Sequence, residues 1–391
     1  MLKWAILRMK VSKKTARRYL LAKHFLLPPK SLSGIKGIDT VFKSLHSIQF
    51  DPQNPCGNNV DLVLQSRVKN IHPLDYHRWL YRQRKGIECL DKELCLVPIE
   101  DFCLCRRVYS NQRTDRFIEE NKKKLEKLVK KISENGELSS SRINNPKKVD
   151  CFWGNPRWGK AALDVLWRTG RLVISKREKG RKYFDLPDKL YGAKFNWPDG
   201  YLPDEERVIR RVESVGILPK TGTGQGWLGM GKGQQIAPIV DELLKKGILK
   251  ELSIDGVNKK YLISSVEKHF FQEIKKMKTI AEFSFLAPLD NLLWDRNTIR
   301  DLFDFDYKWE VYTPKVQRRY GHYTLPVLYG DRFVARIEPR LVGEILEIKG
   351  LWLEPSFFWD KKSLAAFYDC LNRFCRYLKN SSVNWLCDKP D

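Results

Sequence analysis

Apolar residues recur every three to four positions along much of the chain, which is the spacing of one buried face of an α-helix. This pattern predicts helices over residues 11–27, 37–46, 114–133 and 362–378. Ser12 is placed to cap the first helix, because a serine hydroxyl can accept a hydrogen bond from the first turn. Lysines fill the face of the third helix opposite its apolar stripe, so that face is either solvated or lies beside phosphate groups.

A different pattern occurs at residues 44–55, SLHSIQFDPQNP, where a strand-like apolar run ends at Pro52. Side chains alternate across a strand, so Gln49 and Asp51 point to the same side. Two interpretations follow. Asp51 initiates a turn before the proline and shares a face with Gln49 by coincidence, or the amide and the carboxylate together form a polar site.

Residues 163–187 and 240–264 repeat one pattern. Each begins as an amphipathic helix that ends at a glycine, followed by a strand, a second glycine in a turn, and a strand that carries a tyrosine. These positions are Gly170, Gly180 and Tyr183 in the first copy, and Gly247, Gly256 and Tyr261 in the second. A helix followed by a two-stranded wing is the plan of a winged helix, so we expect tandem winged helices, with a further one in the N-terminal part. Winged helices bind DNA or other proteins, and the pattern leaves both open.

The first copy is strongly basic and is the better candidate for contact with phosphate groups. Its candidate DNA-binding residues are Arg157, Lys160, Arg168, Lys176, Arg177, Lys179, Arg181 and Lys182. Between the copies, residues 221–234 contain Gly226-x4-Gly231-Lys232, a spacing typical of phosphate-binding loops. Gly233 replaces the hydroxyl residue that would hold magnesium there, so we interpret the segment as a flexible linker or a DNA-facing loop.

Short alternating runs begin at residue 281 and predict a small sheet or barrel, closed by the last helix. The expected fold is therefore α+β, with tandem winged-helix motifs and a C-terminal small β-barrel. Breaker-rich linkers at 136–150 and 191–203 suggest the domain limits. The four predicted parts are a helical or winged-helix region with the Gln-x-Asp pair (1–135), a second winged helix (136–195), a third (196–280) and the barrel with its terminal helix (281–391).

Composition adds a partner class to this picture. The 72 lysines and arginines against 47 acidic residues give a net charge of +25, which suits a polyanion such as nucleic acid or an anionic membrane surface. The nine cysteines contain no CxxC pair and the six histidines are scattered, so we predict reduced thiols, no metal and no cofactor. No stretch approaches the roughly 20 apolar residues of a membrane span. We expect a cytoplasmic, nucleoid-associated monomer.

Several strings, in chain order, resemble the winged-helix DNA glycosylases of the AlkZ and YcaQ group. The matching strings are SIQFDP around Gln49 and Asp51, DLVLQSRVKN (61–70), LVPIEDF (96–102), PLDNLLWDR (288–296) and LFDFDYKWEVYTPKVQRRYGHYTLPVLYGDR (302–332). The resemblance implies tandem winged helices, a C-terminal barrel and a DNA-binding channel, with Gln-x-Asp as the catalytic motif. Many members have paired histidines just before the string matching LVLQSR, whereas this chain has Asn58, Asn59, Val60 and Asp61 there, which places it in a different branch.

The implied reaction is hydrolysis of the N-glycosidic bond of an alkylated purine in double-stranded DNA, or of a crosslinked one, leaving an abasic site. Asp51 would accept a proton from the attacking water and Gln49 would orient that water. Arg318 and Arg319, in the last matching string, are candidates for phosphate contact. Phe50 is expected in the core, with a wedge between bases as the alternative. Trp153 and Trp158 are expected to pack against neighbouring residues, with DNA contact as the alternative, and Trp294 is expected to be structural. The alternatives are a non-catalytic winged-helix transcriptional regulator and an RNA- or protein-binding module.

Overall fold

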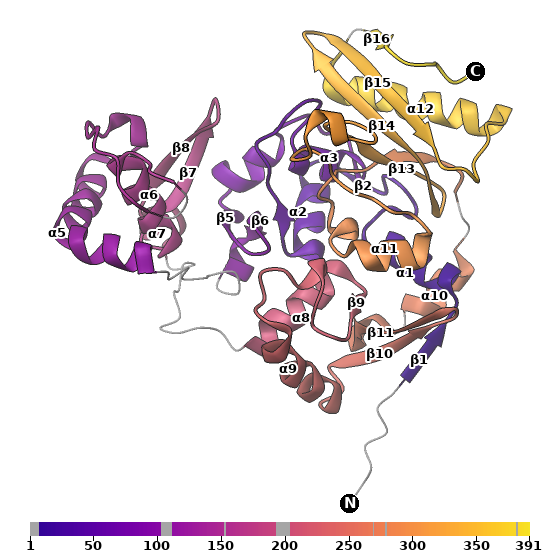
Figure 1. Cartoon of the computed structure of the whole chain (residues 1–391), viewed down its shortest axis with the longest axis horizontal. Coiled ribbons are helices and arrows are strands. Elements are labelled where there is room, and N and C mark those ends of the chain that lie inside the picture. The colour runs from indigo at the N-terminus through magenta and orange to yellow at the C-terminus, as the bar shows by residue number, and fades with distance from the viewer. Residues whose placement is uncertain are drawn as a thin grey trace, which may run out of the picture. The chain divides into compact units, whose positions relative to one another are not determined.

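The structure is a computed structural model that describes residues 8–102, 112–151, 154–192, 204–268, 270–277, 280–380 and 382–391. The chain divides into two compact units (Figure 1). Met1–Tyr76 and Pro203–Asp391 form the first, here called the discontinuous unit, and His77–Leu202 form the second, called the inserted unit. The boundary after Leu202 falls at the end of the linker predicted at 191–203. The finer division into four parts stays a prediction.

The discontinuous unit contains most of the helices. They are α1 (Lys13–Lys23), α2 (Gly34–Leu45), α3 (Asn59–Gln65), α8 (Asp204–Val215), α9 (Gly233–Lys245), α10 (Phe270–Lys276), α11 (Arg296–Phe303) and α12 (Lys361–Leu378). The predicted cap of the first helix is confirmed, because the Ser12 hydroxyl accepts a hydrogen bond from the Thr15 backbone N–H at 3.2 Å. That helix ends at Lys23, earlier than the predicted end at residue 27.

Two larger sheets and one small pairing complete this unit. The first sheet has the order β1-β10-β11-β9, from strands Arg8–Val11, Leu249–Ile254, Val257–Ser264 and Leu218–Pro219. The second has the order β12-β13-β14-β15-β16, from strands Phe283–Phe285, Leu325–Tyr329, Arg332–Val342, Ile345–Leu353 and Ser382–Trp385. Short strands β2 (Leu32–Ser33) and β4 (Val68–Lys69) pair in parallel, and β3 is Ile48–Gln49.

The predicted C-terminal sheet is present, but it is not a closed barrel. Its strand order runs from β12 at one edge to β16 at the other, so among the described residues it is open. Helix α12 lies beside it (Figure 1), and aromatic rings join the two. Phe367 and Phe374 of the helix meet Phe283 and Phe285 of β12 edge-on, at centroid distances of 5.5 Å.

The inserted unit carries the basic copy of the repeated pattern. Its elements are β5 (Gly86–Leu90), β6 (Leu94–Pro98), α5 (Gln112–Asn135), α6 (Trp158–Arg168), β7 (Val173–Glu178), β8 (Arg181–Asp185) and α7 (Pro187–Tyr191). The helix predicted at 114–133 is confirmed as α5. The antiparallel pair β5 and β6 was missed, because no element was predicted for residues 87–97.

Both copies of the repeat contain the predicted helix and hairpin. In the inserted unit, Lys179 and Gly180 form a two-residue turn with φ of 47° and 77°, which is the backbone geometry of a tight hairpin. In the discontinuous unit, Gly247 (φ 72°) ends α9 and Gly256 (φ 74°) lies in the turn between β10 and β11. The assignment of these modules as winged helices stays a prediction.

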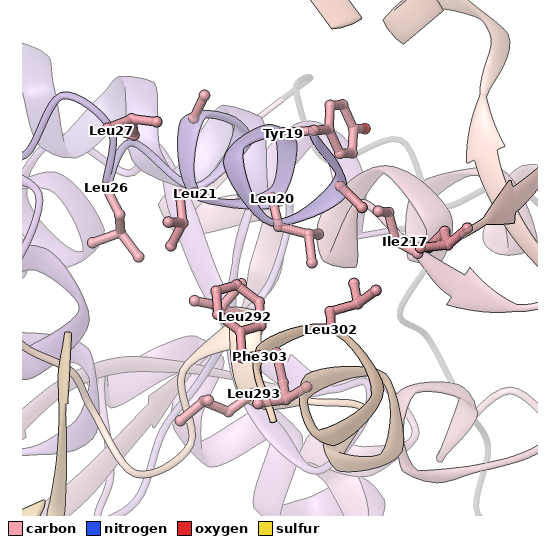
Figure 2. Close-up of a cluster of buried hydrophobic side chains, with 14 of the residues drawn as sticks. Tyr19, Leu20, Leu21, Leu26, Leu27, Ile217, Leu292, Leu293, Leu302 and Phe303 are labelled. Carbon is pink, nitrogen blue, oxygen red and sulfur yellow. The ribbon is translucent and has the colours of Figure 1, made fainter. Parts of the chain in front are cut away.

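The core of the discontinuous unit joins segments far apart in the sequence. Figure 2 shows Leu20 and Leu21 of α1 facing Leu292, Leu302 and Phe303, which come from the region 288–303. These side chains are almost fully buried. Burial of this kind stabilises the fold by roughly 1.5–3 kcal/mol for each large side chain. This packing fixes α1 against residues 288–303.

Residues 221–234 are anchored to the unit rather than a flexible linker, and their alternative interpretation as a DNA-facing loop stays a prediction. Gly226 and Trp227 are buried, and the Trp227 indole donates to the Pro219 carbonyl at 3.0 Å. Arg211 of α8 donates to the Gly226 carbonyl at 2.8 Å. A side chain at Gly226 would collide with Leu218, so this glycine serves close packing rather than phosphate binding.

Candidate active site

The Gln-x-Asp pair lies where the chain leaves a helix and begins a short strand. Helix α2 ends at Leu45, and His46, with φ of 57°, turns the backbone into β3. The strand is therefore shorter than the run at 44–51 suggested. Ile48 is fully buried, whereas Gln49 and Asp51 are each half-buried. The pair thus borders solvent at the end of a strand whose apolar residue anchors it.

Asp51 forms a turn and still keeps one oxygen available. Its Oδ1 accepts a hydrogen bond from the Gln53 backbone N–H at 2.9 Å, so the turn interpretation is confirmed. Its Oδ2 accepts no hydrogen bond from the residues that the structure describes. Partial burial raises the pKa of Asp51 above its usual value, and the bond from Gln53 opposes that rise. A carboxylate with a basic, open oxygen can accept a proton.

Gln49 presents an acceptor that the protein leaves without a donor. Its Oε1 is buried, and no described residue donates a hydrogen bond to it. A buried amide oxygen in this state costs roughly 1–3 kcal/mol, which a donor from outside the protein would recover. The side chain carries the donor and acceptor groups needed to hold a water molecule.

Asn59 holds the backbone of Gln49 in place. Its Nδ2 donates to the Gln49 carbonyl at 2.7 Å, and its Oδ1 accepts from the Leu289 N–H at 3.0 Å. A second amide repeats this arrangement, because Asn291 Nδ2 donates to the Ser47 carbonyl at 2.6 Å. Both asparagines are buried. The strand of the candidate site is therefore tied on each side to residues 289–291.

A buried ion pair reinforces the same connection. Arg67, which follows α3, donates to both carboxylate oxygens of Asp290 at 2.8 Å, and neither side chain is exposed. The Arg67 Nε also donates to the carbonyl of His24 at 2.8 Å. Burial, followed by the Arg67 charge, lowers the pKa of His24 to about 4, so its ring is neutral. Bidentate geometry at zero exposure makes this a rigid connection.

These supporting residues were missed as functional residues from the sequence. Their strings, DLVLQSRVKN and PLDNLLWDR, were recognised only as resemblances, and nothing in them indicated that one string bonds to the other. The departure at Asn58 and Asn59 was the available signal. Asn58 caps α3, with its Oδ1 accepting from Asp61 at 3.0 Å, while Asn59 holds Gln49. Both amides therefore make structural hydrogen bonds in this chain.

Tyr323, from the longest matching string, is close enough to Asp51 for the two groups to interact electrostatically. It is buried, and no described residue makes a hydrogen bond to its hydroxyl. Burial raises the pKa of Tyr323, and the charges of neighbouring groups, Asp51 among them, raise it further. The hydroxyl therefore stays protonated. Its backbone N–H is fixed by a bond to Glu338 Oε1 at 3.1 Å.

The loop that precedes Tyr323 contains the two predicted phosphate contacts. Glu310 accepts hydrogen bonds from the backbone N–H groups of residues 319–321 at 2.9–3.3 Å and shapes this loop. Arg318 is half-buried and donates to the Thr313 carbonyl at 2.8 Å, whereas Arg319 is exposed. Tyr312 and Val316, not predicted as site residues, are 82% and 93% exposed. The loop thus presents apolar and cationic groups together.

The basic residues of the inserted unit divide into two groups. Arg157, Lys160, Lys179 and Arg181 are exposed. The other four are partly buried and make internal contacts. Lys176 pairs with Glu137 at 2.5 Å, Arg177 with Glu88 at 2.6 Å and Lys182 with Asp164 at 3.7 Å. Arg168 lies over the Trp167 ring, 5.8 Å from its centroid.

Of the aromatic residues, Trp158 and Trp294 pack as predicted. Trp158 is buried and its indole donates to Asn121 at 2.8 Å, while the Trp294 indole donates to the Leu289 carbonyl at 3.1 Å. Phe50 is half-buried rather than part of the core. Trp153 lies outside the described residues.

Within the described residues, no group of three potential ligands is arranged to hold a metal ion. The cysteines among them are all free thiols. None of the helices described is both long and apolar enough to cross a bilayer.

Comparison with known proteins bears on both the fold and the family. Residues 42–377 match the model of a family described as "DNA glycosylase AlkZ-like". The structure is also similar to that of the Streptomyces sahachiroi DNA glycosylase AlkZ, with a TM-score of 0.64 over 96% of this chain and 100% of that one, at 14% sequence identity. The matched range includes Gln49, Asp51, Arg67, Asp290 and Tyr323. The chain therefore belongs to the AlkZ-like DNA glycosylase family.

Proposed function

We propose that this DNA glycosylase hydrolyses the N-glycosidic bond of alkylated purines, N7-alkylguanine above all, and leaves an abasic site. Unhooking of an interstrand crosslink is the same bond cleavage at a guanine joined through N7, and we include it in the proposal. The observation that carries it is the pair at the end of β3. Asp51 Oδ2 and Gln49 Oε1 are two acceptors, two residues apart, that no described residue occupies.

Two acceptors suit a water nucleophile. A water molecule that donates one hydrogen to Asp51 and the other to Gln49 turns a lone pair away from both, toward C1′ of a deoxyribose. As the water attacks C1′, the bond to the base breaks and the water proton passes to Asp51. The negative carboxylate also stabilises the positive charge that develops on the sugar. The raised pKa of Asp51 makes its carboxylate a better base. As the pH falls through that pKa, the carboxylate takes up a proton and base release declines.

The leaving group explains why the site needs no acid. An N7-alkylguanine is already cationic, so it departs as a neutral base when it takes the bonding electrons. An undamaged purine would depart as an anion and should react slowly. No lysine is predicted to attack C1′, so the abasic product is not cut by this route.

DNA contact is proposed for the exposed cations of both units. Arg157, Lys160, Lys179 and Arg181 lie on the helix and hairpin of the inserted unit, which we interpret as a winged helix that binds phosphate groups. In the discontinuous unit, Arg319 extends from the loop that also exposes Tyr312 and Val316. The exposed side chains of Tyr312 and Val316 suit contact with unstacked bases. The partner is double-stranded DNA with alkylated or crosslinked bases, bound by a monomer at the nucleoid in the cytoplasm.

The decisive experiment replaces Asp51 with asparagine. Asp51→Asn keeps the size and the bond to Gln53 but removes the base, so release of N7-methylguanine should fall about 10²–10⁴-fold. Affinity for the same duplex, measured by fluorescence anisotropy, should stay within a few-fold. Base release is measured by alkaline cleavage of the abasic product.

The matched control is Asp255→Asn, which removes a carboxylate that is 53% exposed on the hairpin between β10 and β11. It should leave base release unchanged. Full activity of Asp51→Asn would contradict the assignment of the base. Binding to undamaged duplexes without any base release by the wild type would instead favour a transcriptional regulator, which the family match does not support.

A further inference from the structure

A cavity in the discontinuous unit has two lysines and two arginines in its lining. It has a volume of about 490 Å³ and is bordered by the C-terminal half of α12, by β4 and by the turn that follows α1. Its charged residues are Lys30, Lys69, Arg373, Arg376 and Glu282. Neither Gln49 nor Asp51 lines it. Four basic side chains therefore face one carboxylate, at a place separate from the candidate catalytic pair.

Among the described residues, few carboxylates pair with these cations. Arg373 approaches Glu282 at 3.6 Å, and the buried Nε of Arg373 has no hydrogen-bond partner among the described residues. Lys30, Lys69 and Arg376 make no ion pair with any described residue. Burial lowers the pKa of Lys30, and the nearby Arg373 and Arg376 lower it further. Like charges held together in this way repel one another, and a bound anion would reverse that cost.

The walls of the cavity are built from fixed backbone. Arg373 and Arg376 are three residues apart on α12, so they extend from one face of the helix. Lys69 belongs to β4, which is paired with β2, and Asn70 donates to the Ser33 hydroxyl at 3.1 Å. Lys30 has φ of 50°, a conformation that non-glycine residues adopt at a cost and mainly where the surroundings require it.

A purely structural role explains only part of this arrangement. Arg376 lies in the last turn of α12, where a cation interacts favourably with the helix dipole. The dipole does not account for Lys30 and Lys69, which come from other elements and line the same cavity. Two guanidinium groups and two ammonium groups around one space are the recognition chemistry of a phosphate group.

We propose that this cavity binds a phosphate group, either a backbone phosphate of the DNA or that of a free phosphate compound. The inference does not depend on the catalytic roles of Gln49 and Asp51. It is tested by binding and not by base release, so the two proposals fail separately.

The test uses the full chain and the double variant Arg373→Gln/Arg376→Gln. Two probes distinguish the sources: an undamaged 20-base-pair duplex, followed by anisotropy across a salt series, and deoxyguanosine monophosphate, followed by calorimetry. If the phosphate belongs to DNA, the variant should bind the duplex about tenfold more weakly, with a salt slope reduced by about 1–2. If the phosphate group belongs to a free compound, the wild type should bind deoxyguanosine monophosphate. The variant should then bind this nucleotide at least tenfold more weakly.

The matched control is Lys361→Gln/Lys362→Gln, which removes two exposed cations from the first turn of the same helix. Because a general loss of charge affects both variants equally, only the difference between them counts. Lys69→Gln, on β4, is a second and independent variant that leaves α12 intact and should weaken the same probe. The proposal is overturned if the Arg373/Arg376 and Lys69 variants bind both probes as their controls do.

Discussion

The strand of the candidate site and the basic hairpin of the inserted unit use polar side chains in opposite ways. Around the site, buried side chains such as Asn59 and Asn291 hydrogen-bond to the backbone of the strand from distant segments. In the hairpin, cations such as Arg177 pair with carboxylates of their own unit, and others such as Arg181 face solvent. The first arrangement fixes the position of the strand that carries Gln49, and a reaction at one carbon atom requires such fixed positions. The second leaves a charged surface that can adapt to a polyanion.

The largest effect is expected at the buried ion pair behind the site. Asp290→Asn keeps the shape of the side chain but leaves Arg67 charged and unpaired at zero exposure. Breaking such a pair costs about 3–5 kcal/mol of unfolding free energy. Urea unfolding followed by tryptophan fluorescence measures it. Base release should fall as well, because Asp290 and Asn291 belong to the turn that holds Ser47 and, through Leu289, Asn59.

The control is Asp304→Asn, whose carboxylate is 75% exposed and pairs with Lys13 at 3.3 Å on the surface of the same unit. Exposed pairs contribute about 0–1 kcal/mol, so this variant should unfold close to the wild type. Equal stability of the two variants would mean that the Arg67 connection does not hold the strand. The contrast between a fixed site and an adaptable hairpin would then disappear.

The next effect concerns two arginines of the same hairpin. Arg177→Gln leaves Glu88, whose side chain is fully buried, without its bidentate partner, so it should destabilise the inserted unit by about 3 kcal/mol. Arg181→Gln removes an exposed cation and should change stability by less than about 0.5 kcal/mol. Hydrogen exchange at the β7 and β8 amides measures both. Comparable protection in the two variants would show that the hairpin does not depend on the Glu88 pair.

These two arginines also show where prediction from sequence ends. The helix and hairpin that carry them follow from glycine positions and apolar spacing, which are local signals, and both were predicted. The burial of Glu88 beneath Arg177 depends on β5, a strand that the pattern did not reveal. The pair Gln49 and Asp51 was proposed as the site because strand alternation and the motif of the resembling family coincide there. The roles of Asn59 and Arg67 were not predicted, because each also bonds to a residue more than 200 positions away, Leu289 and Asp290, and no local pattern encodes such a bond.

The smallest effect separates DNA contact from protein contact by the inserted unit. If Lys160 and Lys179 each bind a phosphate group, the variant Lys160→Gln/Lys179→Gln should reduce the slope of log affinity against log salt by about 0.9 for each phosphate group that is no longer neutralised. The control is Arg171→Gln, because Arg171 already pairs with Glu126 at 2.7 Å and should release few counterions on binding. Both side chains of the double variant are exposed, so folding should be unaffected. A slope unchanged from the wild type would mean that this hairpin meets another protein, or nothing, and that the exposed cations of the discontinuous unit bind the DNA alone.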